Sequence, residues 1–206
     1  MRIAAAALIA LAFTACTKEG NLKLGGEEVI ETRWRMITTD QDRERLRNWR
    51  KAWVEALPKA RAADAAAIAA EGALFEHDQA LGRAMPPAGD YKCRAFKLGG
   101  QREGMRDFTA YPWFNCRIGR EGEMPTFVKL DGSQRPTGKI YAETDARVIF
   151  LGALELGDET IALDYGRDVK RDLAGYIERV GTTRWRLVLP WPTFESQLDV
   201  IELVPA

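Results

Sequence analysis

From Asp90 to the C-terminus, apolar residues of this chain recur at every second position, in short runs separated by short turns. This two-residue period is typical of β-strands that bury one face. The turns are too short for crossover connections, so consecutive strands are expected to be antiparallel neighbours. Such a meander hides its edges by curling into a barrel or half-barrel. The predicted strands are 91–98, 111–118, 126–131, 138–144, 147–156, 160–165, 172–180, 183–189 and 197–204.

The region before the strands has the period of α-helices instead. The first helix is expected to open at Thr38 or Thr39, where Thr38 and Gln41 have the spacing of a capping box, and to end at Pro58. A second, alanine-rich helix is predicted over residues 60–81, so that the two helices form a hairpin. The apolar positions of the first helix are Leu46, Trp49, Trp53 and Leu57.

These elements predict a single α+β domain over residues 32–206. Its N-terminal helical hairpin, at about 38–82, packs on the antiparallel meander sheet, at about 90–204, which curls into a barrel or half-barrel. A domain of about 190 residues or fewer is long enough to bury a sizeable core. Residues 16–31, in which glycines stand among charged residues, are expected to form a flexible tether.

The first fifteen residues resemble a bacterial lipoprotein signal peptide. Arg2 precedes an uncharged apolar run from Ile3 to Phe13, and Phe13-Thr14-Ala15-Cys16 is similar to a lipobox. The resemblance implies that residues 1–15 are removed and that Cys16 is lipidated. An ordinary secretory signal cut after Ala15, which would leave a free thiol, is the alternative. The apolar run is shorter than the ~20 residues that a transmembrane helix needs.

Thr17 follows the cysteine in place of Asp, which in lipoproteins of this kind points to the outer membrane. The protein is therefore expected to be lipid-anchored in the cell envelope, at the periplasmic face of the outer membrane. Its first predicted partner is the membrane, through the lipid on Cys16. Nucleic acid is not expected as a partner, because the net charge is zero and no block of basic residues occurs.

The chain has three cysteines, and lipidation of the first leaves Cys93 and Cys116 as a pair. Both lie in strand-like runs, and the expected compartment is oxidising, so a disulfide between neighbouring strands is predicted. The alternative is a metal-binding or catalytic thiol pair, which lacks the usual close cysteine spacing.

Few residues of this sequence could carry catalysis. His77 is the only histidine, and Ser133 and Ser196 are the only serines, so a serine-histidine-acid triad is improbable. His77 stands between two acidic residues that would point to different sides of a helix, so neither a metal nor another cofactor is predicted. Carboxylate pairs remain the one enzymatic option, through strand residues such as Glu178, Asp199 and Glu202.

Arginine and aromatic residues alternate in two of the predicted strands. Trp113 and Arg117 share one face of their strand, and Arg186 lies opposite Trp185. The pattern fits an outer sheet face with cation-π pairs, or a groove for an anionic or sugar-like ligand. A one-residue change of register would reverse these faces. The candidate ligand-binding residues are Trp113, Arg117, Tyr141, Trp185 and Arg186.

Several short motifs resemble a bacterial family known as domain of unknown function 4893. The resemblance covers most of the chain after the leader and implies no activity. A weaker, architectural likeness connects the chain with lipocalin-like carriers and with metalloprotease-inhibitor lipoproteins. The chain lacks the Gly-x-Trp signature of the lipocalins, and its two cysteines are placed differently from the pair of the inhibitors. The motifs are Tyr91-x-Cys93, Trp113-Phe114-x-Cys116, Gly138-x-Ile140-Tyr141, Phe150-Leu151-Gly152-Ala153, Gly175-Tyr176-x-Glu178-Arg179 and Trp185-Arg186-Leu187-Val188-x-Pro190-Trp191-Pro192.

The predicted anchor, the predicted disulfide and the scarcity of nucleophiles favour an envelope lipoprotein that acts as a non-enzymatic binding or structural module. Its ligand or protein partner is not indicated by the sequence. The alternatives are a periplasmic hydrolase that uses paired carboxylates, and a small-barrel inhibitor of an envelope protease.

Overall fold

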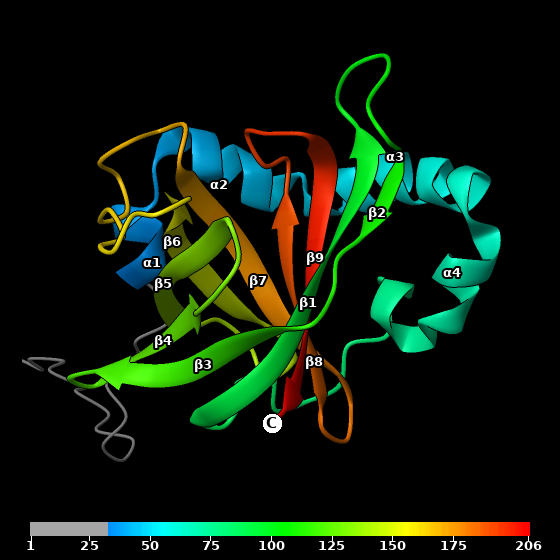
Figure 1. Cartoon of the computed structure of the whole chain (residues 1–206). Helices are drawn as coiled ribbons and strands as arrows, with labels where there is room; N and C mark the ends of the chain where they lie inside the picture. Colours follow the sequence, from blue (N-terminus) through cyan, green and yellow to red (C-terminus); the bar gives the residue numbers. More distant parts are fainter. Residues whose placement is uncertain (1–32) are drawn as a thin grey trace, which may run out of the picture.

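A computed structural model describes residues 33–206. The predicted signal peptide at 1–15, the lipidation site Cys16 and the tether at 16–31 lie outside the described residues. The described chain starts with five helical segments and continues with nine strands (Figure 1). The helical segments are α1 (Arg33–Ile37), α2 (Asp40–Arg47), α3 (Trp49–Ala63), α4 (Ala65–Ala70) and the 3-10 helix η2 (Gly72–Phe75). The strands are β1 (Gly89–Gly100), β2 (Phe108–Ala110), β3 (Phe114–Glu121), β4 (Met124–Lys129), β5 (Gln134–Ala142), β6 (Val148–Leu156), β7 (Asp172–Gly181), β8 (Arg184–Pro190) and β9 (Ser196–Pro205).

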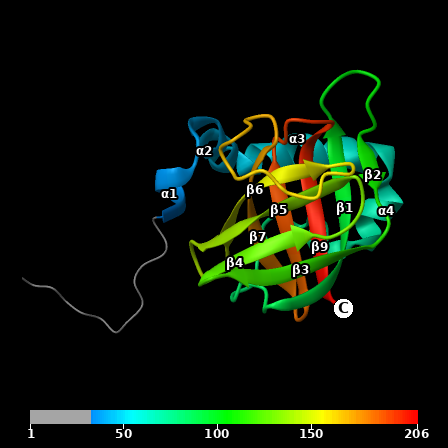
Figure 2. The same ribbon diagram turned by 60° about the vertical axis from the view of Figure 1, so that its left-hand side comes forward.

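The strands form a closed antiparallel barrel, which confirms the predicted α+β fold. Each strand from β3 to β8 pairs with the next one along the chain, and β9 pairs with β1 to close the barrel. The long β1 pairs with β3 through its first half and with the short β2 near its end. Figures 1 and 2 show the barrel with the helices on its outside.

The prediction of a strand at 160–165 is wrong. This segment belongs to the connection between β6 and β7, and these two strands pair directly with each other, so no edge is free between them. Ile161 is 82% exposed, so the apolar residues that alternate here do not form the buried face of a strand. Conversely, the three-residue strand β2 was too short to stand out in the sequence.

The helical hairpin is built from shorter pieces than predicted. Thr39 caps α2 by accepting a hydrogen bond from the Asp42 main chain. Pro58 lies inside α3 rather than at its end. Proline has no N–H to donate to the carbonyl of Val54, four positions before it, but Val54 is solvent-exposed and its carbonyl can bond to water instead. The predicted helix at 60–81 is interrupted at Asp64, which caps α4, and ends in η2. No helix in the described part of the chain is long and apolar enough to cross a membrane.

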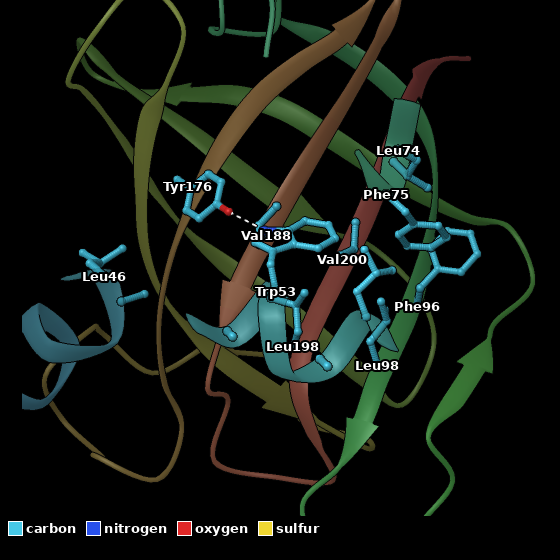
Figure 3. Close-up of a cluster of buried hydrophobic side chains, with 14 of the residues drawn as sticks. Leu46, Trp53, Leu74, Phe75, Phe96, Leu98, Tyr176, Val188, Leu198 and Val200 are labelled. Carbon is cyan, nitrogen blue, oxygen red and sulfur yellow. Dashed lines mark hydrogen bonds between the residues drawn. The ribbon is translucent and has the colours of Figure 1, made fainter. Parts of the chain in front are cut away.

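One core layer lies between the helices and the outer wall of the barrel. The helix α3 crosses β1, β8 and β9, and α2 contacts β7. Trp53 of α3 is 1% exposed and donates a hydrogen bond from its indole to the hydroxyl of Tyr176, at 2.7 Å (Figure 3). Phe75 of η2 packs edge-on against Phe96 of β1. Both faces of these strands are therefore buried.

A second core layer lies inside the barrel. Its lower end is the end at which β1 begins and β9 ends, at the bottom of Figure 1. Aromatic pairs occupy it, among them Tyr91 with Trp185 and Phe127 with Phe150. Gly138 and Gly152 face each other on β5 and β6, and the backbones approach so closely that a Cβ on either glycine would lie within 2.4 Å of the other strand.

Cys93 and Cys116 form a disulfide inside the barrel, as predicted. Their Cα atoms are 5.9 Å apart, within the range of about 4.4–6.8 Å for bridged cysteines. The bond connects β1 to β3, next to the point where β1 leaves β3 and turns to β2. The alternative of a metal-binding or catalytic thiol pair is thereby wrong.

Candidate ligand-binding site

The upper end of the barrel contains a cavity of about 200 Å³, which we call the mouth pocket. Side chains from the barrel strands form its walls, and residues of the β4–β5, β6–β7 and β8–β9 connections form its rim. Most of the apolar lining inside the barrel is small or aliphatic, and aromatic rings stand nearer the rim. The small and aliphatic residues are Ala95, Pro136, Leu154, Leu173, Leu189, Pro192 and Ile201, and the aromatic ones are Tyr111, Phe114 and Phe194.

Lys129, the last residue of β4, contributes a buried amino group to the mouth pocket. Its side chain shares the inner face with Phe127 and is 4% exposed. The ammonium nitrogen lies 3.6 Å from the centre of the Phe114 ring and donates a hydrogen bond to the main-chain carbonyl of Asp131. Burial lowers the pKa of Lys129 to about 8. The Asp131 carboxylate opposes this effect, and the Arg135 guanidinium adds to it.

A second lysine of the pocket, Lys97 of β1, is fully paired. Its ammonium nitrogen lies 3.1 Å from a carboxylate oxygen of Asp199 and 3.1 Å from one of Glu195. Burial alone would lower the pKa of Lys97, but these two carboxylates raise it above its ordinary value. Asp199 also accepts a hydrogen bond from the hydroxyl of Ser196. Lys97 is thus a stable cation whose charge is already balanced.

The rim residues between β8 and β9 are held in an unusual backbone conformation. Trp191 and Glu195 have φ angles of 51° and 71°, which side chains of this size rarely adopt. The segment between them, Pro192-Thr193-Phe194, lines the pocket. Gln101 holds this segment in place by donating hydrogen bonds to the carbonyls of Pro192 and Ser196, at 2.6 and 2.7 Å. Strained backbone that the surrounding structure holds in place is most common at functional sites.

None of the five ligand-binding residues predicted from the sequence lines the mouth pocket. Trp185 lies in the aromatic layer at the lower end of the barrel interior, and Tyr141 is buried in the layer beneath the helices. Trp113 is 47% exposed and stacks on the guanidinium of Arg94. Arg117 forms an exposed ion pair with Asp90 on the outside of β3.

The fifth residue, Arg186, is completely buried between the barrel and the helical layer. Its guanidinium donates two hydrogen bonds to one oxygen of Glu178, at 2.7 and 2.9 Å. It also donates to the main-chain carbonyls of Ala73, Leu74 and Glu76, at the end of η2. Arg186 therefore connects β8 to the helical layer and, because it is completely buried there, does not face the mouth pocket.

The carboxylates proposed for hydrolysis are likewise engaged with basic residues. Glu178 is bound by Arg186 and by Arg147, and Glu202 is bound by two further arginines of the outer wall, Arg94 and Arg184. Asp199 lies apart from both, inside the barrel with Lys97. Within residues 33–206, no group of three or more histidine, cysteine or acidic side chains could hold a metal ion.

The single histidine lies beside the helices and does not line the mouth pocket. His77 follows η2 in an irregular segment, not in a helix as predicted. Its ring stacks on Trp53, and its Nε2 lies 3.2 Å from a carboxylate oxygen of Asp78. These contacts give the histidine a local structural role.

Comparison with protein families identifies the domain that carries this geometry. The family model of a domain of unknown function, DUF4893, matches residues 34–203. The chain belongs to the DUF4893 family. The DUF4893 match covers the helical layer, the barrel and every residue of the mouth pocket. No curated protein and no solved structure matches the chain.

The mouth pocket of this DUF4893 domain was not predicted from the sequence, although one signal was present. Lys129 is in phase with Phe127 along β4, and Lys97 is in phase with Cys93 and Ala95 along β1. A lysine that shares the face of buried residues marks either a paired ion or a polar site inside the barrel. Distinguishing the two needs the positions of Asp199 and Glu195, which are distant in sequence.

Proposed function

We propose that this protein is a lipid-anchored envelope protein whose barrel binds a small molecule in the mouth pocket without catalysing a reaction on it. One observation carries the proposal: aromatic pairs fill one end of the barrel interior, and the other end contains the mouth pocket. A concave, mostly apolar site with a few placed polar groups is what small ligands require. The two carboxylates of the pocket, Asp199 and Glu195, are both bound by Lys97, which favours binding over acid-base chemistry.

The size of the pocket indicates a small ligand. Pockets for drug-sized molecules usually measure about 300–1,000 Å³, and the mouth pocket measures about 200 Å³. The aliphatic lining suits an alkyl or cyclic hydrocarbon portion, because burying such a group contributes about 25 cal/mol per Å² of apolar surface. The polar end of the ligand would then face the rim.

Filling the pocket is expected to prevent ligand binding without unfolding the barrel. Ala95 of β1 lines the cavity, so Ala95→Leu would place three additional carbon atoms in it. We expect octanoate or octan-1-ol to stabilise the native protein by about 2.7 kcal/mol at 100 times its dissociation constant, and this stabilisation to vanish in Ala95→Leu. Thermal denaturation with and without each probe measures the effect.

The matched control is Ala110→Leu, because Ala110 lies on β2, is exposed and does not line the pocket. This variant should respond to the probes as the unmodified protein does. Equal stabilisation of Ala95→Leu and the unmodified protein would place the binding elsewhere. Absence of any response to apolar, anionic and sugar probes in the unmodified protein would contradict the proposal.

The proposed envelope location rests on the lipobox resemblance at Cys16. In cells that process lipoproteins, Cys16→Ser is expected to move the protein from the membrane fraction to the soluble periplasmic fraction, because several acyl chains are lost together. Ala110→Leu, made in the same way at an exposed position of β2, serves as the control for the effect of a substitution as such. If Cys16→Ser stays in the membrane fraction, the protein is not held there by lipid.

A further inference from the structure

We propose that the ligand of the mouth pocket carries an anionic group, carboxylate or phosphate, and that the ammonium group of Lys129 binds it. This inference rests on the proposed function and specifies its ligand class. The apolar part of the ligand lies against the aliphatic wall of the barrel, and the anion lies at the β4 side of the mouth.

The first argument is the balance of charge in the pocket. Its lining contains three lysines, Lys97, Lys129 and Lys170, and two carboxylates, Glu195 and Asp199. Both carboxylates lie 3.1 Å from Lys97. Lys129 forms no ion pair within 4.0 Å among the described residues, and the Asp131 carboxylate acts on its ammonium only from farther away, so one buried positive charge has no direct carboxylate partner.

The second argument is the cost of burying Lys129. Taking an ammonium group out of water is unfavourable unless a charge or several hydrogen bonds replace the water. The carbonyl of Asp131 and the ring of Phe114 supply only part of this replacement, because the ammonium has three donors. A leucine or methionine would fill the same position without this cost. An anionic ligand would supply the missing partner.

The third argument is that nearby groups leave the anion position open. The Asp131 carboxylate accepts hydrogen bonds from the main chain and side chain of Asn115, at 3.0 and 2.7 Å. Arg135 is bound to Glu155 and to three main-chain carbonyls. Neither residue therefore competes for the pocket side of the Lys129 ammonium.

A dependence of binding on pH would accompany this arrangement. The charged groups that face Lys129 are Asp131 and Arg135 on the adjoining segments, and Lys97, Lys170, Glu195 and Asp199 across the pocket. Because the pKa of Lys129 is about 8, the cation is lost as pH rises through that value. The affinity for an anion should therefore fall about tenfold between pH 7 and pH 9, and the affinity for a neutral ligand should not.

The test is calorimetric titration of four probes with the same alkyl chain: octanoate, octyl phosphate, octan-1-ol and octylammonium. We expect the unmodified protein to bind at least one of the two anions ten or more times more tightly than octan-1-ol, and octylammonium more weakly than octan-1-ol. In Lys129→Met the affinity for the anions should fall by about 10- to 100-fold, with octan-1-ol affected less than threefold. The pH dependence should also disappear.

Lys170→Met is the matched control, because Lys170 lies on the exposed rim of the same pocket, and we expect it to lower anion affinity less than threefold. Lys129→Gln provides a second neutral variant, and circular dichroism checks the fold of each. Preference for octyl phosphate over octanoate, or the reverse, identifies which anion the site takes. Equal binding of octanoate, octyl phosphate and octan-1-ol would overturn the anion assignment while leaving the pocket function intact. Binding of none of the four would contradict both.

Discussion

Replacement of Arg186 by alanine is expected to lower the free energy of unfolding by about 3–5 kcal/mol. Arg186 and Glu178 are both completely buried, and the variant would leave Glu178 with only Arg147 as its partner. Three carbonyls at the end of η2 would lose their donor in the same step. Since a domain of this size is stabilised by only about 5–15 kcal/mol, much of the stability would be lost. Urea denaturation followed by tryptophan fluorescence measures the change.

Two further variants separate the buried charge from other effects. Arg117→Ala removes an arginine from an ion pair on the exposed surface, where side-chain exposures are 57% and 62%, and should cost less than about 1 kcal/mol. The double variant Glu178→Leu, Arg186→Met removes both charges and should recover at least half of the lost stability. A loss below about 1 kcal/mol in Arg186→Ala would contradict the view that this residue fixes the helical layer on the barrel.

Removal of the disulfide is expected to lower the free energy of unfolding by about 3 kcal/mol in the chain-entropy model. The bond closes a loop between residues 23 positions apart and fixes β1 against β3 inside the barrel. Cys93→Ala, Cys116→Ala should show the effect in guanidinium denaturation under non-reducing conditions.

Reducing agent provides the control for this prediction. It should destabilise the protein that carries Cys93 and Cys116 by a similar amount and leave the alanine variant unchanged. Retention of full stability by the alanine variant would indicate that the ladder between β1 and β3 alone fixes the two strands. Alkylation of two thiols in native, non-reduced protein would show that the bond does not form.

The sequence predicted the strands well because a two-residue period depends on local residue order. It could not predict which face of a strand is covered, since this depends on distant segments. On β8, Arg186 alternates with Trp185 and Leu187, a pattern that fits either an outer sheet face or a ligand groove. The helical layer covers this outer wall, so Arg186 is buried with Glu178 instead.

The site was missed for a related reason. Lys129 and Lys97 occupy equivalent inward positions, and their sequence neighbourhoods do not distinguish the paired lysine from the unpaired one. Only closure of the barrel between β1 and β9 brings Asp199 to Lys97 and leaves Lys129 without a carboxylate. The empty upper end of the barrel is likewise a property of packing, because it depends on where the aromatic side chains lie.

The most direct test of the central claim is to locate a bound ligand by nuclear magnetic resonance. With octanoate present in excess, we expect intermolecular contacts between the alkyl chain and the methyl groups of Leu154, Leu189 and Ile201 inside the barrel mouth. The amide signals around Lys129 should shift in the same titration. Contacts confined to the outer groove near Trp34 and Trp49, or to no single region, would contradict the assignment of the mouth pocket as the binding site.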